Sequence, residues 1–179
     1  GKVRQIGLSN ETPWGTMKYL ELAETKSLPR VASIQNAYNL VNRGFEIGLS
    51  EVAMHEQVGL LAYSPLAQGT LTGKYLGGQM PQGSRLALFG DGPLMMRYKG
   101  DKTQQAIEMY VNLAKKYEID PAQLAIQFCN IQPFVTSTII GATTMEQLKT
   151  CIDSVDLDIT KEIINEIRSI HKEIPNPAP

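Results

Sequence analysis

The chain has 179 residues, 42% of them hydrophobic, and 17 Lys and Arg side chains balance 18 Asp and Glu for a formal net charge of -1. This composition is typical of a globular protein with one domain and excludes an extended disordered chain. The near-neutral charge argues against nucleic acid and against an anionic membrane surface as partners, because both attract strongly basic faces. No apolar run is long enough for a transmembrane helix, so we expect no membrane association and a cytoplasmic location.

Four short apolar runs are each followed by a polar turn and a stretch with helical periodicity. This order predicts an α/β fold made of βα units with parallel strands. The runs are near-continuously apolar, as expected for strands that are covered on both faces. The predicted strands are residues 3–8, 31–35, 59–63 and 138–140.

Capping residues indicate where the helices begin. Thr12 before Pro13 predicts a helix that runs to about residue 25, and a second helix is expected over residues 46–57. Asp120 before Pro121 predicts a helix to about residue 131, with Gln123 completing a capping box. Thr144 with Gln147 and, later, Thr160 begin two more helices, the last of which directs Ile163, Ile164, Ile167 and Ile170 inward.

The segment between the third strand and the next helical pattern is rich in glycine and proline. Long segments without regular structure are usually lids or disordered, and we expect a lid over residues 64–102. Residues 175–179 carry three prolines, from which we expect a surface strand or a frayed end. The chain begins with Gly1 rather than Met, inside a strand-like run, so we expect it to be part of a longer protein.

Polar residues follow each predicted strand, at the edge where parallel α/β folds bind ligands. Asn10 and Gln35 each present a donor and an acceptor, which suits a carboxamide such as that of nicotinamide. Tyr63 can stack on a flat ring, and Gly141 before a helix suits a phosphate. Each signal alone is weak, because Ser-Asn after a strand is usually only a turn.

The joint spacing of these motifs resembles the aldo-keto reductases, which are NADP-dependent (β/α)8 barrels. Residues 1–10, 34–39, 62–75 and 140–148 are similar to the fifth to eighth strands of that barrel with their loops. The resemblance therefore implies the C-terminal half of a TIM barrel, with residues 1–179 as one unit. The ending at residues 176–179 is similar to that of a bacterial branch of the family.

The resemblance implies a role for each strand-end motif. Ser9, Asn10 and Gln35 would bind the nicotinamide carboxamide, and Tyr63 would stack on the nicotinamide ring. Arg85 occupies the place of a lid arginine near the cofactor. Along the pyrophosphate the resemblance places Ser64, Leu66, Gly69, Leu71 and Lys74, and at the 2′-phosphoadenosine end it places Gly141, Thr143, Gln147 and Cys151.

Two features depart from the family pattern. Cys151 stands where relatives contact adenine with asparagine, and a thiol cannot provide the paired donor and acceptor of a carboxamide. The family's catalytic Asp, Tyr, Lys and His lie on the first four strands, and we assign no catalytic residue to this chain. His55 and His171 lie in helical stretches without metal-ligand spacing, so we expect no metal site, and Cys129 is expected in the core with both cysteines reduced.

The expected function is that of the NADP(H)-binding half of a reductase acting on a small aldehyde or ketone. One alternative is a non-catalytic cofactor-binding or regulatory subunit, since some members of this fold serve ion channels. Another is a half-barrel that pairs with itself or with a separate N-terminal chain to cover its open face.

Overall fold

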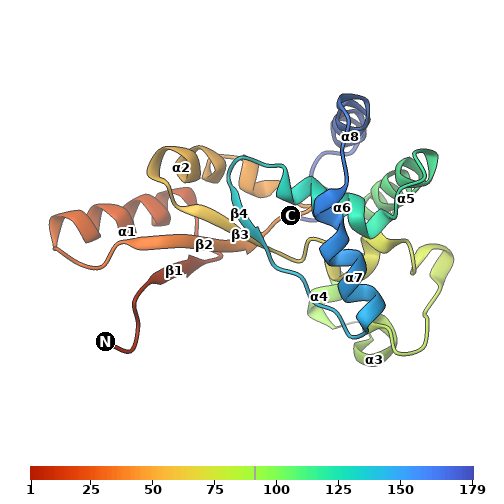
Figure 1. Ribbon diagram of the computed structural model, residues 1–179, viewed down its shortest axis with the longest axis horizontal. Helices are drawn as coiled ribbons and strands as arrows, with labels where there is room; N and C mark the ends of the chain where they lie inside the picture. Colours follow the sequence, from red (N-terminus) through yellow and green to blue (C-terminus); the bar gives the residue numbers. More distant parts are fainter. Residues whose placement is uncertain (91) are drawn as a thin grey trace.

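The computed structural model describes residues 1–90 and 92–179 and shows an α/β fold built on a four-stranded parallel sheet. The strands lie in chain order, β1-β2-β3-β4, as repeated βα units require. Helices α1 (Pro13–Thr25) and α2 (Leu49–Glu56) make the first two crossovers, and both lie on the same side of the sheet (Figure 1). The strands are Ile6–Ser9, Val31–Ala37, Gly59–Tyr63 and Val135–Thr138.

The remaining long helices lie together on the side of the molecule away from the N-terminus (Figure 1). They are α5 (Asp101–Lys116), α6 (Pro121–Asn130), α7 (Met145–Asp153) and α8 (Lys161–Glu173), with 3₁₀ turns at Gly44–Glu46 and Ser154–Asp156. Helix α6 leads into β4, and α5 packs against both α6 and α8. No helix among the described residues is both long enough and apolar enough to cross a membrane.

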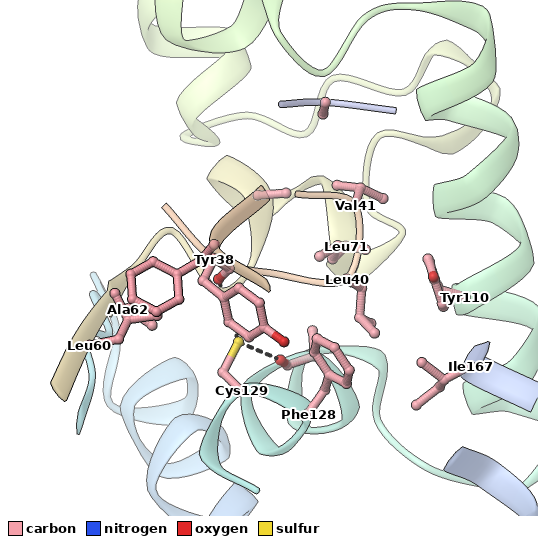
Figure 2. Close-up of a cluster of buried hydrophobic side chains, with 14 of the residues drawn as sticks. Tyr38, Leu40, Val41, Leu60, Ala62, Leu71, Tyr110, Phe128, Cys129 and Ile167 are labelled. Carbon is pink, nitrogen blue, oxygen red and sulfur yellow. Dashed lines mark hydrogen bonds between the residues drawn. The ribbon is translucent and has the colours of Figure 1, made fainter. Parts of the chain in front are cut away.

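One face of the sheet contributes to the hydrophobic core, and the other is partly exposed. Ile34 and Leu60 are paired in register and fully buried against α1 and α2. Ser33, Gln35 and Leu61 alternate with them and keep partial exposure. The core continues into the helices through Tyr38, whose ring stacks on Phe128 (Figure 2). The Tyr38 ring also meets the edge of Phe134.

The predicted helix starts are confirmed by side-chain caps, with one difference. Thr12, Asp120, Thr144 and Thr160 each accept a hydrogen bond from a backbone N–H in the first turn. The Gln123 N–H donates to Asp120 Oδ1 at 3.2 Å, but the Gln123 side chain donates through Nε2 to the Thr150 carbonyl on α7 instead of accepting from the Asp120 N–H as in a capping box. Of the four isoleucines on α8, Ile163, Ile167 and Ile170 are buried, and Ile164 is half-buried.

The fourth strand and the second helix were predicted with wrong bounds. The strand is Val135–Thr138, not 138–140, because Val135 and Ser137 already pair with β3. The chain leaves the sheet after the Ile139 N–H donates to the Ala62 carbonyl at 2.8 Å. The predicted helix over 46–57 is a 3₁₀ turn followed by α2, and Gly48 separates them at φ 89°, a conformation that favours glycine.

The segment predicted as a lid contains short helices. They are Ala67–Thr72, Leu76–Gly78, α3 (Arg85–Phe89) and α4 (Pro93–Met96), and α5 begins at Asp101. Tyr75 and Tyr98 are 8% and 2% exposed and anchor the segment to the body of the fold. Asp91 lies outside the described residues, and the lid role stays a prediction.

The C-terminal tail lies at the surface, with Pro175 and Pro179 exposed, but it is neither a strand nor frayed. Ala178 is 1% exposed, and its N–H donates to the Val41 carbonyl at 3.0 Å. Asn176 Oδ1 accepts from the Arg43 N–H at 2.8 Å, and the Pro177 carbonyl accepts from Thr103 Oγ1 at 2.9 Å. The prolines therefore follow the end of α8, and long-range hydrogen bonds hold the tail after the helix in place.

Candidate nicotinamide and phosphate site

The polar residues predicted at the ends of β1, β2 and β3 lie together at the carboxyl edge of the sheet. Ser9 is paired in register with Gln35, and the Asn10 N–H donates to the Gln35 carbonyl at 3.0 Å. Tyr63 ends β3, and its hydroxyl donates to Asn10 Oδ1 at 2.8 Å. The structure thus brings together the four residues expected at the nicotinamide ring.

These side chains retain unused hydrogen-bonding capacity. The hydroxyl of Ser9, the amide of Gln35 and Nδ2 of Asn10 have no hydrogen-bond partner among residues 1–90 and 92–179. Ser9 and Asn10 are exposed, and Gln35 and Tyr63 are partly exposed, so a ligand can reach them. A group of donors and acceptors around one edge, beside a tyrosine ring, can hold a flat ring that carries a carboxamide.

Two asparagines support this edge, and the sequence reasoning assigned them no role. Asn36 Nδ2 donates to the Glu11 carbonyl at 3.3 Å, while its Oδ1 is buried without a partner within the described part of the chain. Asn39 is fully buried and donates to the Ser64 carbonyl at 2.9 Å. Its Oδ1 accepts from two backbone N–H groups of the following turn, at 3.0 and 2.9 Å.

The loop after β3 has a backbone shape that needs such support. Ser64, Ala67 and Gln68 have φ values of 55°, 49° and 59°, which are uncommon for residues other than glycine. Gln68 Nε2 donates to Ser64 Oγ at 3.0 Å, and Asn39 holds the Ser64 carbonyl. The loop is therefore fixed in a tight path beside Ser9, Asn10, Gln35 and Tyr63.

Lys74 lies over this loop because Gly69 has no side chain. A Cβ on Gly69 would lie 3.0 Å from Lys74 Cε and Nζ, and φ at this glycine is 91°. The Lys74 ammonium is 5.1 Å from the centre of the Tyr75 ring. No carboxylate pairs with Lys74 in the described ranges, so its charge is available to an anion.

The other predicted loop residues differ in how they face the surface. Leu66 is half-buried, and its carbonyl accepts from the N–H groups of Gly69 and Leu71 at 2.8 and 3.2 Å. The Leu71 side chain is 1% exposed and packs in the core, so it can border a ligand only through its backbone. Arg85 is exposed at the start of α3, and the next N–H, of Leu86, donates to the Tyr75 hydroxyl at 3.4 Å.

A second group of predicted residues lies at the start of α7. Residues 140–145 and Leu148 line an open hollow of about 290 Å³. Thr143 donates to Gln147 Oε1 through its N–H and its hydroxyl, at 3.0 and 3.1 Å, which leaves the Gln147 amino group as a donor. No atom lies within 4 Å of the Cβ position of Gly141. The hollow at the N-terminus of α7 thus combines the Gly141 backbone, Thr143 and Thr144 with the apolar residues Ile140, Ala142, Met145 and Leu148.

Cys151 lies on α7 but is turned toward the protein interior. It is 6% exposed, and burial, followed by the charge of Asp120, raises the pKa of its thiol. The thiol is thus not on the open surface of the hollow, and contact with adenine stays a prediction. Both cysteines are free, and Cys129 is completely buried, as predicted.

The histidines are not arranged for metal binding. His55 is exposed on α2, and His171 is half-buried on α8, in agreement with the prediction. Burial and the charge of Arg43 lower the pKa of His171. Within the described residues, no three His, Cys, Asp or Glu side chains are grouped to hold a metal ion.

Comparison with known proteins identifies the family to which the chain belongs. The family model described as "Aldo/keto reductase family" matches residues 1–172. The chain belongs to the aldo/keto reductase family of oxidoreductases.

Individual relatives cover the same region. The chain is 51% identical to Protein tas of Escherichia coli over 179 residues, which is all of this chain and 51% of that protein. It is 40% identical to an aldo-keto reductase of Babesia bovis over 96% of this chain and 62% of the relative. It is 33% identical to L-glyceraldehyde 3-phosphate reductase of E. coli over 87% of this chain and 45% of the relative. The chain thus spans about half the length of the E. coli relatives, and the resemblance to a bacterial branch is confirmed.

Proposed function

We propose that this chain is the NADP(H)-binding C-terminal half of a (β/α)8 barrel that reduces aldehydes or ketones. Four βα units with strands in chain order are half of such a barrel. The chain matches half of Protein tas along its whole length, which supports the same interpretation. The partly exposed face of the sheet, with Ser33 and Gln35, is the face that the other four strands would cover.

The observation that carries the proposal is the cluster of Ser9, Asn10, Gln35 and Tyr63. These residues come from three strands and meet at one edge, joined by the Tyr63–Asn10 hydrogen bond. Their spare donors and acceptors fit a nicotinamide carboxamide, and the Tyr63 ring offers a surface for the nicotinamide ring. NADPH bound there supplies the hydride that reduces the carbonyl carbon.

The phosphates of the cofactor are assigned to the loop after β3 and to the hollow at α7. Ser64, Gly69 and Lys74 would border the pyrophosphate, with Arg85 approaching from α3. The backbone at Gly141 and the side chains of Thr143 and Gln147 would bind the 2′-phosphoadenosine end. An uncompensated lysine charge and free N–H groups at a helix start both favour phosphate. Selectivity for NADP(H) over NAD(H) follows from this assignment.

The chain's own residues would bind and orient the cofactor, and the proton that completes carbonyl reduction must come from elsewhere. Tyr63 is committed to the ring and to Asn10, and His55 lies on α2 in a helix that leads away from the strand ends. General acid catalysis contributes about 10²–10⁴-fold, so a chain without a proton donor loses at least that factor. In the complete barrel the resemblance assigns this role to a tyrosine of the N-terminal half.

Two measurements test the proposal. In a fluorescence titration of the chain, NADPH should bind about tenfold more tightly than NADH, and equal affinity would refute the phosphate assignment. In an assay of NADPH consumption with an aromatic aldehyde, the chain alone should be inactive, and mixing with the N-terminal half of a relative should restore turnover. Binding without turnover in the mixture would favour the non-catalytic subunit, and turnover by the chain alone would contradict the half-site.

A further inference from the structure

The hydrogen bond between Tyr63 and Asn10 determines which groups of the Asn10 amide remain available to a ligand. An asparagine amide has an acceptor on one side and two donors on the other, and rotation by half a turn exchanges them. The two orientations would recognise opposite ends of a carboxamide. The Tyr63 hydroxyl is the one side-chain group bonded to the Asn10 amide within the described residues, at 2.8 Å from Oδ1.

The backbone that carries Asn10 is held in place independently of its side chain. Its N–H donates to the Gln35 carbonyl at 3.0 Å, and its φ of 54° turns the chain sharply after β1. Asn36 Nδ2 then donates to the carbonyl of Glu11 at 3.3 Å. Because the backbone is fixed on both sides of Asn10, the remaining freedom is the side-chain rotation that the Tyr63 hydroxyl limits.

A phenol is a stronger donor than acceptor, because its oxygen lone pairs are delocalised into the ring. The Tyr63 hydroxyl therefore favours the amide oxygen of Asn10 over the amide nitrogen. With Oδ1 directed to Tyr63, the two N–H bonds of Nδ2 are left for a ligand. The Gln35 amide is free of such a constraint, so it can turn its oxygen toward a ligand N–H.

We propose that the Tyr63 hydroxyl is a positioning group that makes Asn10 a hydrogen-bond donor to the carbonyl oxygen of the nicotinamide carboxamide. Gln35 then accepts from the carboxamide NH2. Tyr63 thus has two separable roles, since its ring forms the stacking surface and its hydroxyl acts through Asn10. This inference rests on the proposed function and states which partner donates and which accepts in each hydrogen bond of that site.

Cofactor analogues that change one end of the carboxamide test this polarity. The 3-acetylpyridine analogue of NADP keeps the carbonyl oxygen and lacks the NH2 group, whereas the thionicotinamide analogue keeps NH2 and replaces the oxygen with a weakly accepting sulfur. The variant Tyr63→Phe keeps the ring and removes the hydroxyl. Dissociation constants of NADP and both analogues would be measured by competition with NADPH fluorescence, for the chain and for this variant.

We expect Tyr63→Phe to weaken NADP and the acetylpyridine analogue by the same factor, about two- to tenfold, the range for one neutral hydrogen bond. The thionicotinamide analogue should be weakened less, because its contact with Asn10 is already poor. Asn10→Ala should reproduce this pattern. Tyr19→Phe makes the same chemical change on the half-exposed surface of α1 and should change none of the three affinities.

The opposite pattern would overturn the inference. If the loss in Tyr63→Phe disappears with the acetylpyridine analogue and persists with the thionicotinamide analogue, Asn10 presents its oxygen to the ligand NH2. If Tyr63→Phe binds all three like the unmodified chain, the hydroxyl does not position Asn10, while the proposed cofactor site stands. If the unmodified chain shows no saturable binding of NADPH, the proposed function fails and the inference fails with it.

Discussion

Two polar clusters, one that includes Gln35 of β2 and one that directly follows this strand, differ in how their hydrogen bonds are used. The strand-end cluster of Ser9, Asn10, Gln35 and Tyr63 is partly exposed and keeps free donors and acceptors. In the triad of Tyr38, Arg43 and Glu46, Tyr38 is fully buried and the other two residues are half-buried. Most of its polar atoms are hydrogen-bonded, and Arg43 Nη1 is the buried atom of the triad without a partner within the described residues. Arg43 Nε and Nη2 donate to the two Glu46 carboxylate oxygens at 2.6 and 2.7 Å, and the Tyr38 hydroxyl donates to Oε1 at 2.6 Å.

The triad is enclosed by aromatic rings, and this shifts its titration. The Arg43 guanidinium lies 5.3 Å from the centre of the Phe128 ring, on which Tyr38 also stacks. Burial alone would raise the pKa of Glu46, but hydrogen bonds from Arg43 and Tyr38 outweigh it and lower the pKa. Polar groups that satisfy one another thus stabilise the fold, whereas polar groups with spare capacity are available for binding.

The largest expected effect is on stability, from Glu46→Ala. Removal of the carboxylate leaves the guanidinium of Arg43 and the hydroxyl of Tyr38 without their shared acceptor, which should lower the unfolding free energy by about 2–4 kcal/mol. Urea denaturation measures this change. The matched control is Glu21→Ala, which breaks an exposed ion pair with Lys18 of the same sequence spacing and should cost no more than about 0.5 kcal/mol. Equal losses of unfolding free energy in the two variants would show that the triad stabilises the fold no more than an exposed ion pair does.

Lys74→Ala, in contrast, should weaken cofactor binding and leave stability nearly unchanged. It removes a positive charge that no described carboxylate neutralises, so the dissociation constant for NADPH should rise about tenfold or more while the urea midpoint changes little. Lys102→Ala, on the exposed start of α5, is the control for a general loss of positive charge. An unchanged affinity in Lys74→Ala would remove this residue from the phosphate site.

A smaller effect on stability is expected when the pH is lowered. The folded-state pKa values of Glu46 and His171 are both lowered, the second chiefly by burial, so the unfolded chain binds more protons at these groups. Their contribution to stability is present above their ordinary pKa values and is lost as the pH falls through the folded-state values. The urea concentration at the denaturation midpoint should therefore decrease as the pH is lowered below 6.5, the ordinary pKa of histidine. The decrease should be less steep in His171→Gln. A midpoint independent of pH from neutrality into this range would contradict the assignment.

Local signals in the sequence predicted the capped helices and the converging strand ends. Thr12, Asp120 and Thr144 act within one helical turn, so their caps could be recognised without the fold. Parallel strands in chain order bring Ser9, Gln35 and Tyr63 to one edge by topology alone. These features depend on short-range chemistry or on a single rule of connectivity.

The failures concern long-range contacts. Ala178 in the tail is buried and its N–H donates to the Val41 carbonyl, and no local pattern encodes that contact. Asn39 has an ordinary loop composition around it, and its role becomes visible only when its three hydrogen bonds are seen together. The motif over residues 34–39 could have drawn attention to Asn36 and Asn39, since two more amides follow the same strand as Gln35.

The most direct test of the central claim is an NADPH titration of Gln35→Leu, with its urea midpoint measured in parallel. The side chain of Gln35 is partly exposed and has no partner within the described residues, so its loss should leave the midpoint almost unchanged. We predict a dissociation constant about five- to tenfold higher than that of the unmodified chain, as expected for the loss of a hydrogen bond to the carboxamide. An unchanged dissociation constant would contradict the assignment of this strand-end cluster to the nicotinamide.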